Sequence, residues 1–102
     1  MDNILEEIIK RIVKEVSPDK IVLFGGRAKD GNKRLGDYDI CVLKKGIRHK
    51  GKVAKRIYHR LFGVGAAVDI IVQNPKKFEE LKDNPFLIYR EIEKFGKVLY
   101  EK

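Results

Sequence analysis

Residues 20–43 read Lys-Ile-Val-Leu-Phe-Gly-Gly-Arg-Ala-Lys-Asp-Gly-Asn-Lys-Arg-Leu-Gly-Asp-Tyr-Asp-Ile-Cys-Val-Leu, two apolar runs separated by a glycine pair and a polar segment. The first run, 20–24, is short and rich in branched and aromatic side chains, which is typical of a strand. Gly25 and Gly26 follow it directly, and the segment 29–35 has the composition of a loop. That length lets the chain reverse, so we expect the second run to form a strand beside the first.

Two aspartates lie at the start of the second strand, which we expect over residues 37–43. Asp37 and Asp39 are two positions apart, so in a strand both carboxylates point to the same face. Two like charges held this close are unfavourable unless a cation lies between them. A third carboxylate, Asp69, lies inside the apolar run 66–72, which indicates a buried strand where an ionised group needs a compensating partner. Three oxygen ligands of this kind suit a hard cation such as Mg²⁺, which also binds phosphates.

The glycine pair supplies the other half of a site. Gly25 and Gly26 let backbone N–H groups approach a ligand closely, and the helical turn expected after them favours an anion. The candidates for triphosphate contacts are the basic residues that follow, Arg27, Lys29, Lys33 and Arg34. We favour solvated loop charges for the last two, and we leave Arg27 open between a phosphate contact and solvent. Carboxylates for a metal and a glycine turn for phosphates together predict a metal–nucleotide site.

Taken as a set, these motifs resemble the DNA polymerase β nucleotidyltransferase superfamily. The matching pieces are Phe24-Gly25-Gly26, Asp37-Tyr38-Asp39-Ile40 and Val68-Asp69-Ile70. The short chain, the Arg27-Ala28 pair and the ending over 89–100 are similar to the minimal nucleotidyltransferases (MNT), and the resemblance covers nearly the whole chain. The sequence departs from the common pattern at Gly36, where many members have Ser, and at Lys29-Asp30, where Arg-Gly is common.

The resemblance implies a polymerase-β-like nucleotidyltransferase fold, an α/β (α+β) architecture in which helices pack on a small mixed sheet. It implies two-metal chemistry with two Mg²⁺ ions, or Mn²⁺ instead, and with ATP as the substrate. In this chemistry Asp37 and Asp39 bind the metal that carries the triphosphate, and Asp69 helps to hold the second metal and to deprotonate the acceptor hydroxyl. The nucleotide-binding residues that the resemblance implies are Gly25, Gly26 and Arg27.

The resemblance also implies a partner protein. Larger members carry a helical domain that grips the acceptor, and 102 residues leave no room for one. Minimal members typically accompany a HEPN-type helical toxin, so the implied role is that of an antitoxin that moves AMP from ATP to a tyrosine of that toxin (AMPylation). An alternative is a nucleotidyltransferase-like protein that neutralises or bridges a partner by binding alone, which Gly36 and Asp30 leave open. A basic RNA- or DNA-binding module and a homodimer also stay open.

Length and composition predict a single domain over residues 1–102. The net charge of +8 favours phosphate-bearing partners, although a surface rich in Lys and Glu is also typical of thermophile proteins. We interpret the single cysteine, Cys41, as a core residue without a disulfide, which fits a reducing cytoplasm. Met1 leads into a charged amphipathic pattern instead of a secretory signal, and no apolar run is long enough to span a bilayer. We therefore expect a soluble cytoplasmic protein that does not bind membranes.

Apolar periodicity predicts helices around the sheet. The first has its apolar stripe over 5–16, with Asp2 or Asn3 as its cap and Ser17-Pro18 at its end. A second is expected over 47–62, with Phe62 beside its apolar stripe. The polar face of this second helix is strongly basic, through Arg48, Lys50, Lys52, Lys55, Arg56 and Arg60. Because we see no exposed aromatic residue among these cations, we favour a solvated face over a nucleic-acid footprint.

The C-terminal third is expected to hold two short helices and a last strand. Asn74-Pro75 and Asn84-Pro85 each predict a helix start, Gly96 predicts the end of the second helix, and 98–100 is expected to be a strand. His49 and His59 lack metal-ligand spacing, so we interpret them as surface imidazoles.

Overall fold

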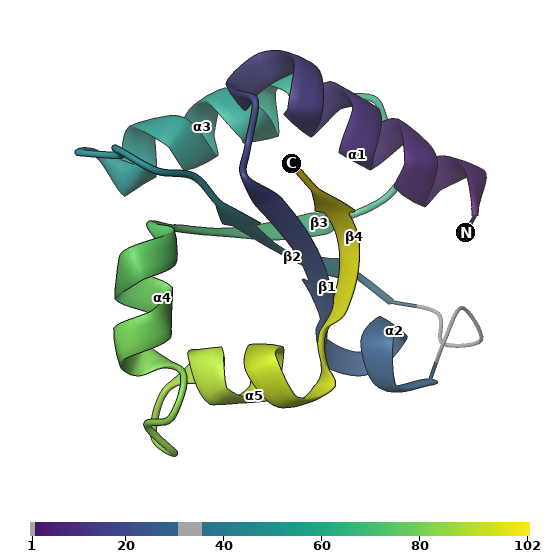
Figure 1. The fold of residues 1–102 in the computed structure, drawn as a ribbon. Coiled ribbons are helices and arrows are strands. Elements are labelled where there is room, and N and C mark those ends of the chain that lie inside the picture. The colour runs from purple at the N-terminus through teal and green to yellow at the C-terminus, as the bar shows by residue number, and fades with distance from the viewer. Residues whose placement is uncertain (1, 31–35) are drawn as a thin grey trace.

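The computed structural model describes residues 2–30 and 36–102 (Figure 1). The predicted loop cations Lys33 and Arg34 lie outside the described residues. The elements, in chain order, are α1 (Asn3–Val16), β1 (Lys20–Phe24), α2 (Gly25–Asp30), β2 (Tyr38–Leu43), α3 (Lys50–Leu61), β3 (Val68–Gln73), α4 (Pro75–Leu81), α5 (Ile88–Phe95) and β4 (Lys97–Glu101). This mixed sheet with helices packed on it is the fold class that the sequence predicted.

The four strands lie in the order β3-β2-β1-β4. β1 pairs antiparallel with β2 and with β4, whereas β2 and β3 run parallel. The register places Phe24, at the end of β1, opposite Asp39 near the start of β2. Asp39 in turn lies opposite Asp69 near the start of β3. The end of one strand and the starts of two others therefore meet at one end of the sheet.

Both faces of the sheet are covered, because the strand side chains alternate between two apolar layers. Ile21 and Leu23 of β1 belong to the layer beneath α1 and α3. Val22 and Phe24 point the other way and pack with Phe78 of α4 and Ile92 of α5. Figure 1 shows α1 and α3 on one side of the sheet and α4 and α5 on the other.

The first helix begins and ends as its sequence predicts. The Leu5 N–H donates to Asp2 Oδ1 over 2.6 Å, which satisfies one of the free donors of the first turn. Ser17 ends the helix in the left-handed conformation, with φ of 46°. The second prediction, a helix over 47–62, is wrong at both ends. Ile47 instead exchanges two hydrogen bonds with the Asn74 side chain, of 3.0 and 3.1 Å, and this holds the segment before α3 against the start of α4.

Five other boundaries differ from the sequence prediction. β2 begins at Tyr38, so Asp37 precedes the strand in which the sequence placed it, and β4 covers Lys97–Glu101 instead of 98–100. Lys29 and Asp30 belong to the last turn of α2 instead of the loop predicted over 29–35. Asn84-Pro85 do not start a helix, because the Asn84 side chain accepts a hydrogen bond from the Phe86 N–H in a local turn and α5 begins only at Ile88. The third strand covers Val68–Gln73 instead of 66–72.

Cys41 is fully buried in the layer beneath α4 and α5, and burial raises the pKa of its thiol to about 12. It is a free cysteine, as expected. In the part of the chain that the structure describes, no helix combines the length and the apolar character needed to cross a membrane.

Candidate active site

The three predicted aspartates come together at one end of the sheet. Asp39 and Asp69 are direct neighbours in the parallel register of β2 and β3, and Asp37 immediately precedes β2. All three line a pocket of about 370 Å³, together with Gly26, Arg27, Lys29 and Gly36. The β1–α2 turn supplies one wall of this pocket and the strand starts supply the other, so the sequence motifs that lie far apart in the chain share one cavity.

Burial and mutual repulsion act together on the carboxylates of this cluster. The pKa of Asp39 is raised above its usual range, first by burial, then by the negative charges of Asp69 and Asp37, and further by a hydrogen bond with Asp69. Glu91 of α5 raises this pKa too. Sequence reasoning missed Glu91, because only the packing of α5 against α2 brings it near the strand ends. The negative charge collected here is what a bound cation would relieve.

Asp69 does not have the buried position that its apolar run predicts. It is exposed, because β3 lies at the edge of the sheet and has only β2 as a neighbour. Sequence cannot distinguish an edge strand from a central one by its apolar residues alone. The need for a counter-charge therefore comes from the clustering of Asp69 with Asp39, since Asp69 itself is not desolvated.

Gly25 brings the helix start into contact with the carboxylates. Its φ of 72° lies in the region that favours glycine, and a Cβ atom at this position would overlap Asp39 Oδ2. The first residue of α2 can therefore lie directly against the Asp39 carboxylate. The glycine pair was predicted for the close approach of a phosphate, and for Gly25 the structure adds a second reason, the close approach of Asp39 on the neighbouring strand.

Arg27 supports the segment that leads into Asp37. Its Nε donates to the Gly36 carbonyl oxygen over 3.0 Å, and its guanidinium lies 3.8 Å from the centroid of the Tyr38 ring. The Tyr38 hydroxyl donates to Asp2 Oδ2 over 2.9 Å, which ties the start of β2 to the start of α1. The sequence left Arg27 between phosphate and solvent, and the structure gives it a positioning contact in the pocket wall.

Lys29 links the pocket to α5. Its Nζ lies 3.0 Å from Glu91 Oε1 and 4.9 Å from the centroid of the Phe95 ring. This ion pair is half exposed, so it contributes little to stability. The ion pair matters instead for position, because it holds α5 near the pocket of the three aspartates and so places the exposed Phe95 ring beside it.

The donor chemistry of the pocket fits a hard divalent cation. Asp39 and Asp69 supply adjacent carboxylates with no nitrogen or sulfur ligand among the lining residues, which is the donor set of Mg²⁺ or Mn²⁺. Across residues 2–30 and 36–102, however, no three His, Cys, Asp or Glu side chains are arranged so that they could hold a metal ion. Asp37 lines the same pocket and is exposed.

Comparisons with known proteins give matches that cover nearly the whole chain. A sequence model of the family described as "Polymerase beta, Nucleotidyltransferase" matches residues 6–102. The structure is similar to that of a candidate nucleotidyltransferase from Sulfolobus solfataricus, with a TM-score of 0.68, 18% identity and coverage of 97% of this chain and 78% of that chain. It is also similar to a toxin–antitoxin structure solved with AMP-PNP, with a TM-score of 0.69, 19% identity and coverage of 99% of this chain and 75% of that chain. No curated protein sequence matches.

Proposed function

Because the chain belongs to the polymerase β nucleotidyltransferase family, we propose that it transfers AMP from ATP to a tyrosine hydroxyl of a HEPN-type helical toxin and so acts as an antitoxin. The observation that carries the proposal is the meeting of Asp37, Asp39 and Asp69 beside the Gly25–Gly26 turn. A fold shared with a toxin–antitoxin structure that holds AMP-PNP supports the choice of partner and nucleotide.

In this proposal Asp37, Asp39 and Asp69 hold one or two Mg²⁺ ions, or Mn²⁺. Divalent cations bound there would draw the triphosphate into the pocket and stabilise the charge that develops on the departing pyrophosphate. Gly25 lies against the Asp39 carboxylate and Gly26 lines the same pocket, so their backbone N–H groups would contact the phosphates.

The transfer itself is an exchange of bonds at the α-phosphorus. The acceptor oxygen bonds to the α-phosphorus as the bond from that phosphorus to the oxygen bridging to the β-phosphate breaks, and pyrophosphate leaves. The proton of the acceptor hydroxyl passes to the Asp69 carboxylate, which the edge position of β3 leaves open to an incoming acceptor. Arg27 keeps Gly36 and therefore Asp37 in place through Nε, and its remaining N–H groups would contact the phosphates.

An exposed apolar surface next to the pocket supports a protein acceptor. Five large apolar side chains on α5 and its flanks are exposed, namely Phe86, Leu87, Ile88, Phe95 and Val98. Phe95 adjoins the pocket through Lys29, so a protein bound on this surface would reach the aspartates. Exposed apolar side chains gathered on one part of a fold often mark protein interfaces.

The test is to incubate the purified chain with a HEPN-type partner, ATP and MgCl₂, and to measure the mass of the partner. The proposal predicts the added mass of AMP on a tyrosine, and its loss with Asp39→Asn. An unchanged partner mass in a complex that forms normally would contradict the proposed transfer.

A second candidate is neutralisation by binding alone. Two observations favour it. Among the described residues, no three His, Cys, Asp or Glu side chains are arranged so that they could hold a metal ion. Arg27 already contacts Gly36 and Tyr38. Under this candidate, Asp37→Asn would protect cells from the toxin as well as the parent protein does. Under the proposed transfer, protection would be lost although the complex still forms.

A further inference from the structure

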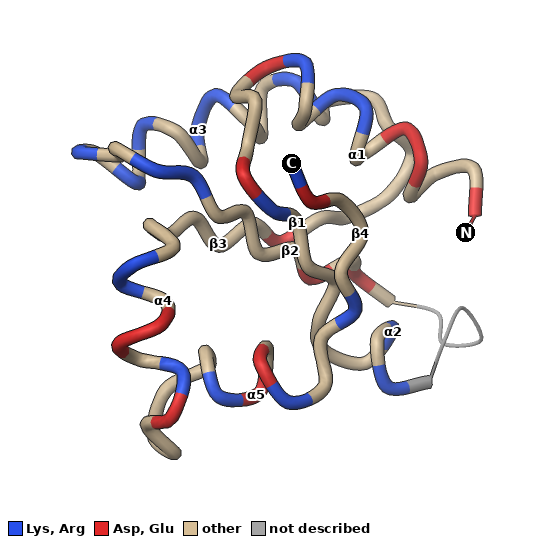
Figure 2. The backbone as a smooth tube through the Cα atoms, in the orientation of Figure 1, with Lys and Arg blue, Asp and Glu red and all other residues tan. Residues whose placement is uncertain are grey.

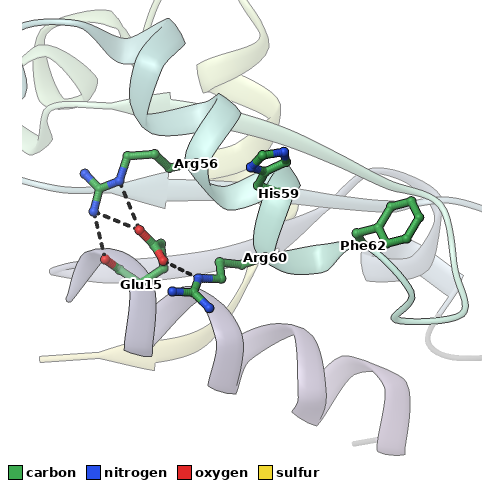
Figure 3. A pocket seen from close by; sticks show the side chains of 5 residues that line it. All are labelled: Glu15, Arg56, His59, Arg60 and Phe62. Carbon is green, nitrogen blue, oxygen red and sulfur yellow. Dashed lines mark hydrogen bonds and ion pairs between the residues drawn. The ribbon is translucent and has the colours of Figure 1, made fainter.

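A second hollow lies on the side of the molecule formed by α1 and α3, between α1 and the C-terminal end of α3 (Figure 3). It is lined by Glu15, Arg56, His59, Arg60 and Phe62, none of which lines the pocket of the three aspartates. We propose that this surface binds single-stranded nucleic acid, with the arginines on phosphates and the Phe62 ring on a base. The proposal is independent of the transfer reaction.

The two arginines are held in place by one carboxylate. Arg56 Nη2 lies 3.0 Å from Glu15 Oε2, and Arg60 Nε lies 2.5 Å from Glu15 Oε1. The Glu15 side chain is only 15% exposed, whereas those of Arg56 and Arg60 are 56% and 66% exposed. Each guanidinium therefore turns part of its donor fork to the carboxylate and the rest to solvent. Because one negative charge fixes two positive ones, the pair keeps an excess positive charge in a preorganised orientation, which suits phosphate oxygens.

The positive surface continues along α1. An adjoining hollow shares Glu15, His59 and Arg60 with the first and adds Glu7, Lys10, Arg11 and Lys14. Together the two hollows are lined by five Lys or Arg side chains against two carboxylates. Figure 2 shows Lys and Arg positions along both helices. A basic face that extends over two helices suits a chain of phosphates better than a single free nucleotide.

Phe62 supplies an exposed aromatic side chain on this basic face. We expected it beside the apolar stripe of α3, but it follows the last helical residue and is 89% exposed. Its backbone is nevertheless fixed, because Arg11 Nη1 donates to the carbonyl oxygens of Arg60 and Phe62, each over 3.1 Å. The Phe62 backbone is therefore held by Arg11, and its ring lines the basic hollow. Figure 3 shows the ring beyond the end of α3, to one side of Arg60.

The combination of cations with an exposed aromatic ring favours single-stranded nucleic acid over other ligands. Aromatic rings stack on unpaired bases whatever their identity, and cations beside them follow the backbone of the same strand. A duplex would satisfy the cations but offers no free base face to Phe62. A membrane surface is disfavoured, because the polar face of α1 also carries Glu7 and Glu15.

The test is fluorescence anisotropy with labelled oligo(U) and oligo(dT) strands of about 15 nucleotides over a salt series. We expect log K to fall with log salt by about 0.7 for each phosphate neutralised. Lys10→Gln and Lys14→Gln should each lower that slope by about 0.7. Phe62→Ala should weaken binding at least about fivefold while the slope stays the same. Arg56 and Arg60 are left in place, because they also join α3 to α1 through Glu15.

Matched controls separate this surface from the general charge of the protein. Phe86→Ala removes an equally exposed ring, 92% exposed, from the other side of the molecule. Lys76→Gln and Lys77→Gln remove two exposed cations of α4. The proposal is overturned if no salt-dependent binding is found, if the Phe62 and Lys10 variants bind as these controls do, or if ATP displaces the strand as effectively as an unlabelled strand does.

Discussion

At the scale of single residues, Gly25 places the β1–α2 turn directly against the Asp39 carboxylate of the pocket. Gly25→Ala should lower both stability and nucleotide binding, because it adds backbone strain at a φ of 72° and a methyl group that overlaps Asp39 Oδ2. Gly46→Ala is the matched control, since Gly46 has a φ of 75° but open space around its Cβ position.

Urea denaturation of the two glycine variants separates strain from overlap. Gly46→Ala should cost about 1–2 kcal/mol, from the backbone alone. Gly25→Ala should cost more, and should also abolish metal-dependent ATP binding, since Asp39 has to move. Equal losses of stability, with ATP binding kept in both variants, would contradict the role given to this glycine.

Asp39 should destabilise the metal-free protein. Its pKa is raised in the folded state, so folding favours the protonated carboxyl, and stability falls as pH rises through the interval between the unfolded and the folded pKa. Asp39→Asn removes this loss. We expect thermal unfolding at neutral pH without metal to give a higher Tm for Asp39→Asn than for the parent, and the difference to shrink in acid.

Adding Mg²⁺ or Mn²⁺ to the same samples should reverse the order. The parent should gain stability by binding the ion, whereas Asp39→Asn should not. Asp83→Asn, at an exposed position in the turn after α4, is the control and should follow the parent under both conditions. A metal-dependent rise in Tm that is equal in all three proteins would place the ion elsewhere.

At the scale of elements, local signals were sufficient for α1 and β1. The Asp2 cap, the apolar stripe and the Ser17 end all lie within the helix or next to it, so the sequence predicts its extent. The edge position of β3 and the true start of α3 depend on contacts with distant segments, such as the Asn74 bonds to Ile47. These could not be read from periodicity.

The contact between α1 and α3 gives a prediction with a defined pH dependence. Hydrogen bonds from Arg60 and Arg56 lower the pKa of Glu15, so its contribution to stability is present above the usual carboxyl pKa and is lost as pH falls through the folded value. Glu15→Gln should therefore melt below the parent at neutral pH, and the two curves should converge in acid once Glu15 is protonated.

The control for this experiment is a carboxylate in a weaker ion pair. Glu80 lies 3.7 Å from Lys77, with both side chains 55% exposed, so Glu80→Gln should change Tm little at any pH. Thermal unfolding by circular dichroism between neutral and acid pH measures all three proteins. A Glu15→Gln deficit that persists unchanged in acid would mean that packing, and not the charge pair, joins the helices.

At the scale of the whole molecule, the sequence predicted which motif residues would lie together better than it predicted the residues around them. The spacing of the aspartates and glycines predicts strands joined by a glycine turn, and the fold brings these motifs together at one pocket. Glu91 and Phe95 have no such signal, because α5 reaches the pocket only through its tertiary contacts with α2, among them the ion pair of Glu91 with Lys29. The surroundings that would decide acceptor and affinity are therefore tertiary features.

The apolar surface on α5 and its flanks should bind the partner. Phe86→Ser should leave the Tm nearly unchanged, because the ring is 92% exposed, but should weaken partner binding by about tenfold or more. Phe62→Ser is the control, since it removes an 89% exposed ring from the other side. Isothermal titration with the toxin measures both. Equal affinities for the two variants would place the partner elsewhere.

The central claim is that the three aspartates direct nucleotidyl transfer, and one labelling experiment tests it most directly. The purified chain, its partner and MgCl₂ are incubated with ATP labelled at the α-phosphate or, in parallel, at the γ-phosphate. We predict label on the partner from the α-position only, and none with Asp39→Asn. Label from the γ-position, equal labelling by Asp39→Asn, or no label from either ATP would contradict the account.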